Sequence, residues 1–193
     1  MTLELNEVLL RGEDQPLSLL ADEGVLTCIT GGTAALRTRW LHVLMGFERP
    51  VDGYVNIDGE PLHDGGSIAH LRRHIAFAPA CLDTVGEIVP YEPPTAAEVF
   101  SLRSNRRLGV AEADIVGEEY RTGTTGQKAR LLAVAVLRQT PVLLVDSPSA
   151  ASAAYLHDLA AQGRTLIVAT DDEAIIAQAD NVVELPSRSD SVV

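Results

Sequence analysis

The 193-residue chain is 46% hydrophobic, which is enough apolar material for one domain with a packed core of its own. Its formal net charge of −12 argues against a nucleic-acid partner, because an acidic surface repels the phosphate backbone. No apolar run approaches the roughly 20 residues of a membrane helix, and no basic-then-apolar signal opens the sequence, so we expect a cytoplasmic protein.

The first quarter of the chain predicts an N-terminal β portion followed by one strand–glycine–helix unit. Strands are predicted over 2–10, 17–20 and 25–30. The first of them alternates apolar and polar residues, which suits a strand at the edge of a sheet. Gly31 and Gly32 come next, and a helix with Gly46 as its C-terminal stop is predicted over 34–46. Glycines between a strand and a helix are typical of loops that bind phosphate.

The middle of the chain begins with a hairpin-like stretch, 49–62, in which Asp-Gly pairs predict turns at 52–53 and 58–59. Beyond it we predict a helix over 67–73, a strand over 74–77, a loop over 81–94 and short helices over 95–120.

The C-terminal third alternates between helical and strand patterns. Helices are predicted over 126–138, 153–162 and 172–178, and strands over 142–145, 165–169 and 182–185. Such alternation favours a mainly parallel sheet with helices on both faces. The polar end, 186–193, predicts a flexible tail.

Five segments, taken in this order, resemble the ATP-binding domain of ABC transporters over about residues 3–185. They are GFERPVDGYVNIDGEPL (46–62), LRRHIAFAP (71–79), TGTTGQKARLLAVAVLRQTPVLLVDSPSA (122–150), GRTLIVATDD (163–172) and ADNVVEL (179–185). The resemblance implies an α/β fold with a P-loop NTPase-like sheet core and an N-terminal antiparallel β portion. It also implies a small helical subdomain over about 82–138 within a single domain, 1–193.

The resemblance places the family's phosphate-binding loop, Gly-x-x-x-x-Gly-Lys-Ser/Thr, on the segment GGTAALRT. Leu36 stands at the second glycine, where a side chain crowds the approach of phosphate to the backbone. Arg37 stands at the lysine and keeps the charge, but its planar fork is wider than an ammonium group. The segment is either a degenerate nucleotide-binding loop or, as we favour, a strand–helix turn kept for folding. In the first case Gly31, Gly32, Arg37 and Thr38 would bind the nucleotide.

Asp146 ends the apolar run 142–145 and matches the aspartate of the family's Walker B strand. It could therefore bind Mg²⁺ together with Thr38. The alternative is a strand-end aspartate that accepts hydrogen bonds from nearby backbone. Ser147 stands where the family has its general base, and a serine hydroxyl cannot take a proton from water at neutral pH as a carboxylate does.

Other family positions also carry different residues. Ala80 stands at the glutamine that senses Mg²⁺, Ala153 at the aspartate of the aspartate loop, and Asp171 at the switch histidine. With Leu36 and Ser147 they make five positions at which the family's chemical group is missing. The signature sequence, which in the family closes over nucleotide held by the opposite subunit, is better preserved, with Thr124, Gly126 and Gln127.

These departures predict a degenerate, hydrolysis-deficient ABC-type subunit without catalytic residues of its own. It would form a homodimer or heterodimer with another ABC ATPase subunit, at the inner face of the membrane through a permease, as a regulatory or structural partner. Two alternatives stay open. One is an atypical ABC ATPase that binds and hydrolyses Mg-ATP, and the other is a soluble interaction domain that reuses the fold without a transporter. The sequence specifies neither the transported substrate nor the direction of transport.

Overall fold

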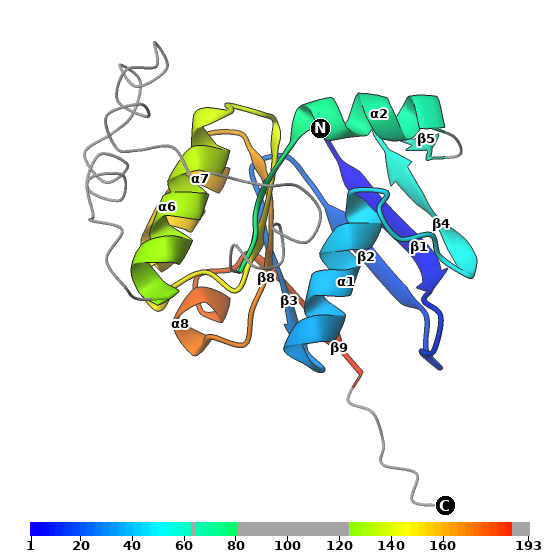
Figure 1. Ribbon diagram of the computed structural model, residues 1–193, viewed down its shortest axis with the longest axis horizontal. Coiled ribbons are helices and arrows are strands. Elements are labelled where there is room, and N and C mark those ends of the chain that lie inside the picture. The colour runs from blue at the N-terminus through cyan, green and yellow to red at the C-terminus, as the bar shows by residue number, and fades with distance from the viewer. Residues whose placement is uncertain (63–64, 81–123, 187–193) are drawn as a thin grey trace, which may run out of the picture.

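The described part of the chain forms two sheets on either side of one helix (Figure 1). The computed structural model describes residues 1–62, 65–80 and 124–186, with the backbone alone at 65–66 and 124–127. The antiparallel sheet has the order β2-β1-β4-β5, with β1 Leu3–Leu9, β2 Leu17–Ala21, β4 Asp52–Ile57 and β5 Glu60–Pro61. The parallel sheet has the order β6-β7-β8-β3-β9, with β3 Leu26–Gly31, β6 Ile75–Ala78, β7 Val142–Asp146, β8 Thr165–Ala169 and β9 Asn181–Leu185.

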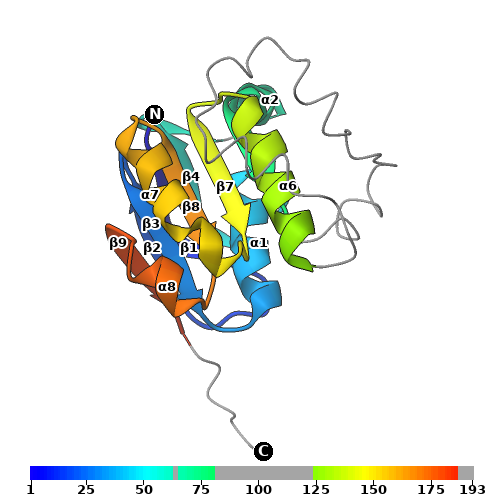
Figure 2. The ribbon, with the colours of Figure 1, turned by 90° about the vertical axis from the view of Figure 1, so that its left-hand side faces the viewer.

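The helices divide between the two faces of the parallel sheet. Helix α1 (Ala34–Leu44) lies between this sheet and the antiparallel one, whereas α6 (Thr124–Leu137), α7 (Ala153–Ala161) and α8 (Glu173–Ile176) cover the opposite face (Figure 1, Figure 2). Helix α2 (Gly65–His74) leads directly into β6, and a 3₁₀ turn, η2 (Ala150–Ser152), precedes α7. The helices therefore cover both faces of the sheet, as the alternating pattern predicts.

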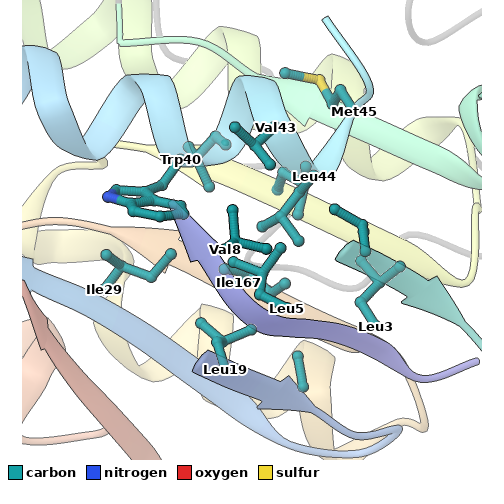
Figure 3. Packing of buried hydrophobic residues seen from close by; sticks show 14 of the residues in the cluster. Leu3, Leu5, Val8, Leu19, Ile29, Trp40, Val43, Leu44, Met45 and Ile167 are labelled. Carbon is teal, nitrogen blue, oxygen red and sulfur yellow. The ribbon is translucent and has the colours of Figure 1, made fainter. Parts of the chain in front are cut away.

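Two apolar clusters hold these layers together, and β7 contributes to both. Leu144 faces α1 and the antiparallel sheet, while Leu143 and Val145 face α6 and α7. Trp40 and Leu44 of α1 point into the first cluster, which strands of both sheets line (Figure 3). Successive strand residues alternate between the two faces of a sheet, so a strand that is covered on both faces is buried throughout. All five residues of β7 are buried, the four apolar ones from Val142 to Val145 and Asp146.

The predicted α/β class, parallel core and antiparallel N-terminal portion are confirmed. Gly46 also ends α1 as predicted, since it has φ +67° and its N–H donates to the carbonyl of Val43 at 2.9 Å. Most of the predicted helical subdomain, 82–138, lies outside the described residues, as do the predicted loop 81–94, the helices predicted over 95–120 and all but the first residue of the tail, Pro186.

Two local predictions are wrong. The strand over 2–10 is β1, which lies inside its sheet between β2 and β4, because alternation of burial reports a one-sided sheet and not an edge. The pair Asp52-Gly53 is not a turn but the start of β4, opposite a bulge in β1. Gly53 has φ +77°, and a Cβ there would lie 2.2 Å from the carbonyl oxygen of Glu7, so this bulge requires glycine.

Candidate functional site

The predicted residues of the loop after β3, together with Asp146, Ser147 and Asp171, lie where three parallel strands end beside the first turn of α1. Gly31 is the last residue of β3, and Asp146 is the last residue of β7 and lies in register with Ala169, the end of β8. Ligands of open α/β sheets bind outside the carboxyl ends of the strands, so the topology brings these residues to the expected edge.

The loop between β3 and α1 is shorter than a phosphate-binding loop, because the helix begins at Ala34. Thr33 caps it: its Oγ1 accepts from the N–H of Leu36 at 3.1 Å, and its carbonyl accepts from the N–H of Arg37 at 3.0 Å. A phosphate-binding loop directs free backbone N–H groups at its ligand. Two of the N–H groups expected in that role are therefore already bonded within the chain.

Leu36 lies against the loop and not away from it. Its side chain is half-buried and packs on the apolar cluster that includes Leu185. A Cβ placed on Gly32, whose φ is +56°, would lie 3.1 Å from Leu36 Cδ2. The leucine at the family's second glycine position thus covers the backbone of the loop, as the crowding argument predicts.

Arg37 turns inward and is only 3% exposed. One terminal nitrogen, Nη1, donates to the carbonyls of Gly31 at 2.9 Å and Gly32 at 3.4 Å. The other, Nη2, pairs with Oδ2 of Asp171 at 3.0 Å, and Nε is buried with no partner among the described residues. The side chain of Asp171 itself is 79% exposed. The residues at the family's lysine and histidine positions therefore bind each other.

Both carboxylate oxygens of Asp146 accept hydrogen bonds from side-chain hydroxyls. Oδ2 accepts from Oγ1 of Thr38 at 2.6 Å, and Oδ1 accepts from Oγ of Ser147 at 3.0 Å. Asp146 is 3% exposed, so these bonds replace water around a buried charge. The sequence predicts backbone groups or Mg²⁺ as partners of this aspartate. The described hydrogen bonds to its carboxylate come from two hydroxyls, one of them on Thr38, the residue predicted to bind Mg²⁺ with it.

Ser147 has φ +47°, a left-handed backbone that costs a non-glycine residue about 1–2 kcal/mol. Its N–H donates to the carbonyl of Ala169 at 2.8 Å, which fixes the turn after β7 to the end of β8. The hydroxyl at the position of the family's base is thus held against Asp146.

Other predicted residues lie apart from this arrangement or outside the described side chains. Ala80 is half-buried after β6, and Ala153 is buried at the start of α7. Thr124, Gly126 and Gln127 fall in the first turn of α6, where only the backbone is described.

Sequence reasoning missed two contributors. One is Thr33, although a threonine just before a helical pattern is a known capping signal. The other is the pairing of Arg37 with Asp171, which the opposite charges at two adjoining family positions could have indicated.

Cys28 of β3 is the buried free thiol nearest in sequence to the loop. Burial raises its pKa to about 11, although the positive charge of Arg37 acts in the opposite direction. The thiol therefore stays protonated at neutral pH. Within the described ranges, no three histidine, cysteine, aspartate or glutamate side chains gather closely enough to hold a metal ion.

Comparison with known proteins agrees with the fold. The sequence profile of the ABC transporter family matches residues 15–150, which is more than half of the chain. The chain therefore belongs to the ABC transporter family, in its ATP-binding domain.

Similar curated proteins are about three times as long as this chain. An ATP-dependent lipid A-core flippase of Cupriavidus metallidurans is 29% identical over 88% of the chain, which covers 32% of the flippase. A macrolide export ATP-binding/permease protein of Chromobacterium violaceum is 26% identical over 95% of the chain, and 33% of that protein is covered.

Solved structures resemble the fold closely. A post-hydrolysis dimer of an ATP-binding cassette with ADP and Pi has a TM-score of 0.68 at 20% identity, over 95% of this chain and 94% of the cassette. A bacterial Atm1-family ABC exporter with ATP bound has a TM-score of 0.70 at 18% identity, over 95% of this chain and 37% of the exporter. None of the helices in the described part of the chain has the length and apolar character needed to cross a lipid bilayer.

Proposed function

We propose that this chain is a non-hydrolysing ABC-type subunit that pairs with another ATP-binding domain and regulates or supports a membrane permease. One observation carries the loss of hydrolysis. The residue that follows the Walker B aspartate is Ser147, and its hydroxyl is bonded to Asp146 at 3.0 Å. Attack of water on a phosphoryl group needs a group that orients the water and accepts its proton, and a serine so held offers neither.

The residues present also do not fit Mg-ATP. The N–H groups of Leu36 and Arg37 are bonded to Thr33, and the Arg37 guanidinium is committed to loop carbonyls and Asp171. A triphosphate would have to break these contacts and would meet a carboxylate instead of the histidine that the family has there. Losing positioning and charge stabilisation together removes most of what catalysis of phosphoryl transfer requires.

A partner is supported by the signature residues and by the names of the relatives. Thr124, Gly126 and Gln127 match the segment that, in the family, completes a nucleotide site on the opposite subunit. The macrolide exporter joins an ATP-binding part and a permease in one protein, and this chain spans about a third of it. Both observations fit a subunit whose signature residues complete the partner's nucleotide site, while its own site does not hydrolyse ATP. It would act at the inner face of the membrane, on the cytoplasmic side.

Phosphate release by the purified chain tests the loss of hydrolysis. The wild type and Asp146→Asn are assayed side by side with Mg-ATP, together with a mock purification that measures contaminating ATPase. We expect both proteins to match the mock sample. Turnover by the wild type that Asp146→Asn abolishes would contradict the proposal.

The partnership needs a separate experiment. The tagged chain is purified from its native cells in mild detergent, with an untagged strain as the control. We expect an ABC subunit with an intact loop lysine and base glutamate, or a permease, in near-stoichiometric amount. A stable monomer with neither would favour an interaction domain that has no transporter.

An atypical but working ATPase is the second candidate, and one contact favours it. Thr38 and Asp146, the two residue types that hold Mg²⁺ in the family, lie 2.6 Å apart. The two candidates differ in calorimetry with Mg-ATP. Submillimolar binding that depends on Mg²⁺ would support the ATPase, and binding that is absent or independent of Mg²⁺ would support the silent subunit.

A further inference from the structure

The ion pair between Arg37 and Asp171 joins two segments that are far apart in the sequence. Arg37 belongs to the first turn of α1, and Asp171 lies in the connection between β8 and α8. The side chain of the arginine is 4% exposed and that of the aspartate 79%. Within the described ranges, the buried cation is therefore paired with one carboxylate, which lies on the solvent side.

Both terminal nitrogens of the arginine have partners among the described residues, whereas Nε is buried without one. Nη1 donates to the carbonyls of Gly31 and Gly32, and Nη2 meets the carboxylate at 3.0 Å. A guanidinium has five N–H donors and pairs well with planar or tetrahedral oxyanions. On Nη2 the guanidinium meets one oxygen of a carboxylate that is itself mostly in water, so this is the side from which an external oxyanion would approach the cation.

From this geometry we infer that Asp171 is an internal ligand that takes the place of phosphate on Arg37 and keeps anions out of the loop. The inference rests on the proposed function, because it explains how the altered site stays closed without nucleotide. A phosphate that approaches Arg37 meets the negative charge of Asp171, and like charges in such a position oppose binding strongly. Removal of that charge opens the cation to oxyanions without any need for Mg²⁺.

The exposure of Asp171 makes the pair open to test. Because the carboxylate is mostly in water, its replacement by the isosteric amide removes little packing. The buried guanidinium then loses the one carboxylate that pairs with it in the described part of the chain, and a buried cation tolerates such a loss poorly. An inorganic anion can supply the missing charge, so Asp171→Asn gains a site for oxyanions such as pyrophosphate.

The experiment titrates the full chain with inorganic pyrophosphate in the presence of a metal chelator, by calorimetry and by the shift of the thermal unfolding midpoint. Asp171→Asn is expected to bind pyrophosphate about tenfold or more tightly than the wild type. Asp171→Glu keeps the carboxylate and should bind as weakly as the wild type. Asp158→Asn makes the same change of charge at an exposed position of α7 and should also leave binding unchanged.

A double variant, Asp171→Asn with Arg37→Met, assigns the gain to the arginine. It should lose the added pyrophosphate affinity while keeping the circular dichroism of a folded chain. Asp171→Ser serves as a second neutral variant if the amide proves unstable. The proposal is overturned if the neutral variants bind no better than the wild type, if the double variant keeps the gain, or if the wild type already binds as tightly as Asp171→Asn.

Failure here and failure of the proposed function give different results. ATP turnover by the wild type contradicts the silent subunit, whatever pyrophosphate does. A wild type that releases no phosphate but binds pyrophosphate as well as Asp171→Asn leaves the proposed function standing and removes Asp171 as the internal ligand.

Discussion

The two ends of α1 depend on different kinds of contact. Trp40, Leu41 and Leu44 are at most 2% exposed and pack between the two sheets, against residues from distant parts of the chain (Figure 3). In the first turn the apolar Leu36 is only half-buried, while Thr33 caps the helix and Arg37 bridges the loop to Asp171.

This difference explains how the family's fold can persist while the residues at its motif positions change. A change in the body of α1 removes buried area that both sheets share, and no nearby group can replace it. A change in the first turn alters hydrogen bonds that other polar groups of the same loop can make. The site residues can therefore differ together while the layers stay in place, which is the sense in which fold and function are separable.

The largest expected effect comes from the body of the helix. Trp40→Ala should lower the free energy of unfolding by about 3–5 kcal/mol, because it opens a cavity between the two sheets. Leu36→Ala in the first turn is the matched apolar truncation and should cost about 1 kcal/mol, since its side chain is only half-buried. Denaturant unfolding measures both, and equal losses would contradict the contrast between the two ends.

The next largest expected effect is a loss of folding stability at alkaline pH, caused by ionisation of Cys28 in β3. Its pKa is raised by burial from 9.0 to about 11, so between these values the thiol ionises in the unfolded chain but not in the folded one. Stability from the buried thiol is complete below pH 9 and falls by about 2 kcal/mol toward pH 11.

Unfolding curves of the wild type and Cys28→Ala at pH 8 and above pH 10 isolate this effect. The wild type should lose more stability than the variant over that interval, because other groups that titrate there are common to both. An equal loss in both proteins would show that the thiol is not held protonated by the fold.

The helix cap should give a smaller effect. Thr33→Ala removes the acceptor of the Leu36 N–H and should lower stability by about 1 kcal/mol, whereas Thr33→Ser keeps the oxygen and should stay near the wild type. Thermal unfolding compares the three proteins. If Thr33→Ala is as stable as the wild type, the Leu36 N–H has another partner, and the Thr33 cap does not explain why the helix begins at Ala34.

Much of the framework could be predicted from the sequence, because burial leaves a periodic pattern. The runs that form β3, β7 and β8 are mainly apolar, and the order of strands and helices favours a parallel sheet. The bulge opposite Gly53 could not be predicted, since an Asp-Gly pair also fits a turn and only the partner strand decides between them.

Several residues of the site could be predicted from the sequence, but their contacts could not. Comparison with the family's motifs located Arg37, Asp146, Ser147 and Asp171, because each follows a recognisable strand or loop. Their pairing depends on rotamers and on the register of β7 with β8, which a sequence pattern does not contain. A motif indicates which residues share an edge of the sheet, and the structure is needed to show which of them form hydrogen bonds or ion pairs with one another.

The smallest expected effect is on turnover, where restoring one group should change nothing. Ser147→Glu returns a carboxylate to the position of the family's base, yet we expect phosphate release to stay at the level of Ser147→Ala and of the mock sample. A base accelerates hydrolysis only when phosphate and water are held in position beside it. Here the N–H groups of the first turn are bonded to Thr33, and Arg37 is paired with Asp171. An increase of tenfold or more with Ser147→Glu alone would contradict this expectation. It would mean that the first turn of α1 still positions nucleotide, and that its contacts with Thr33 and Asp171 break when nucleotide binds.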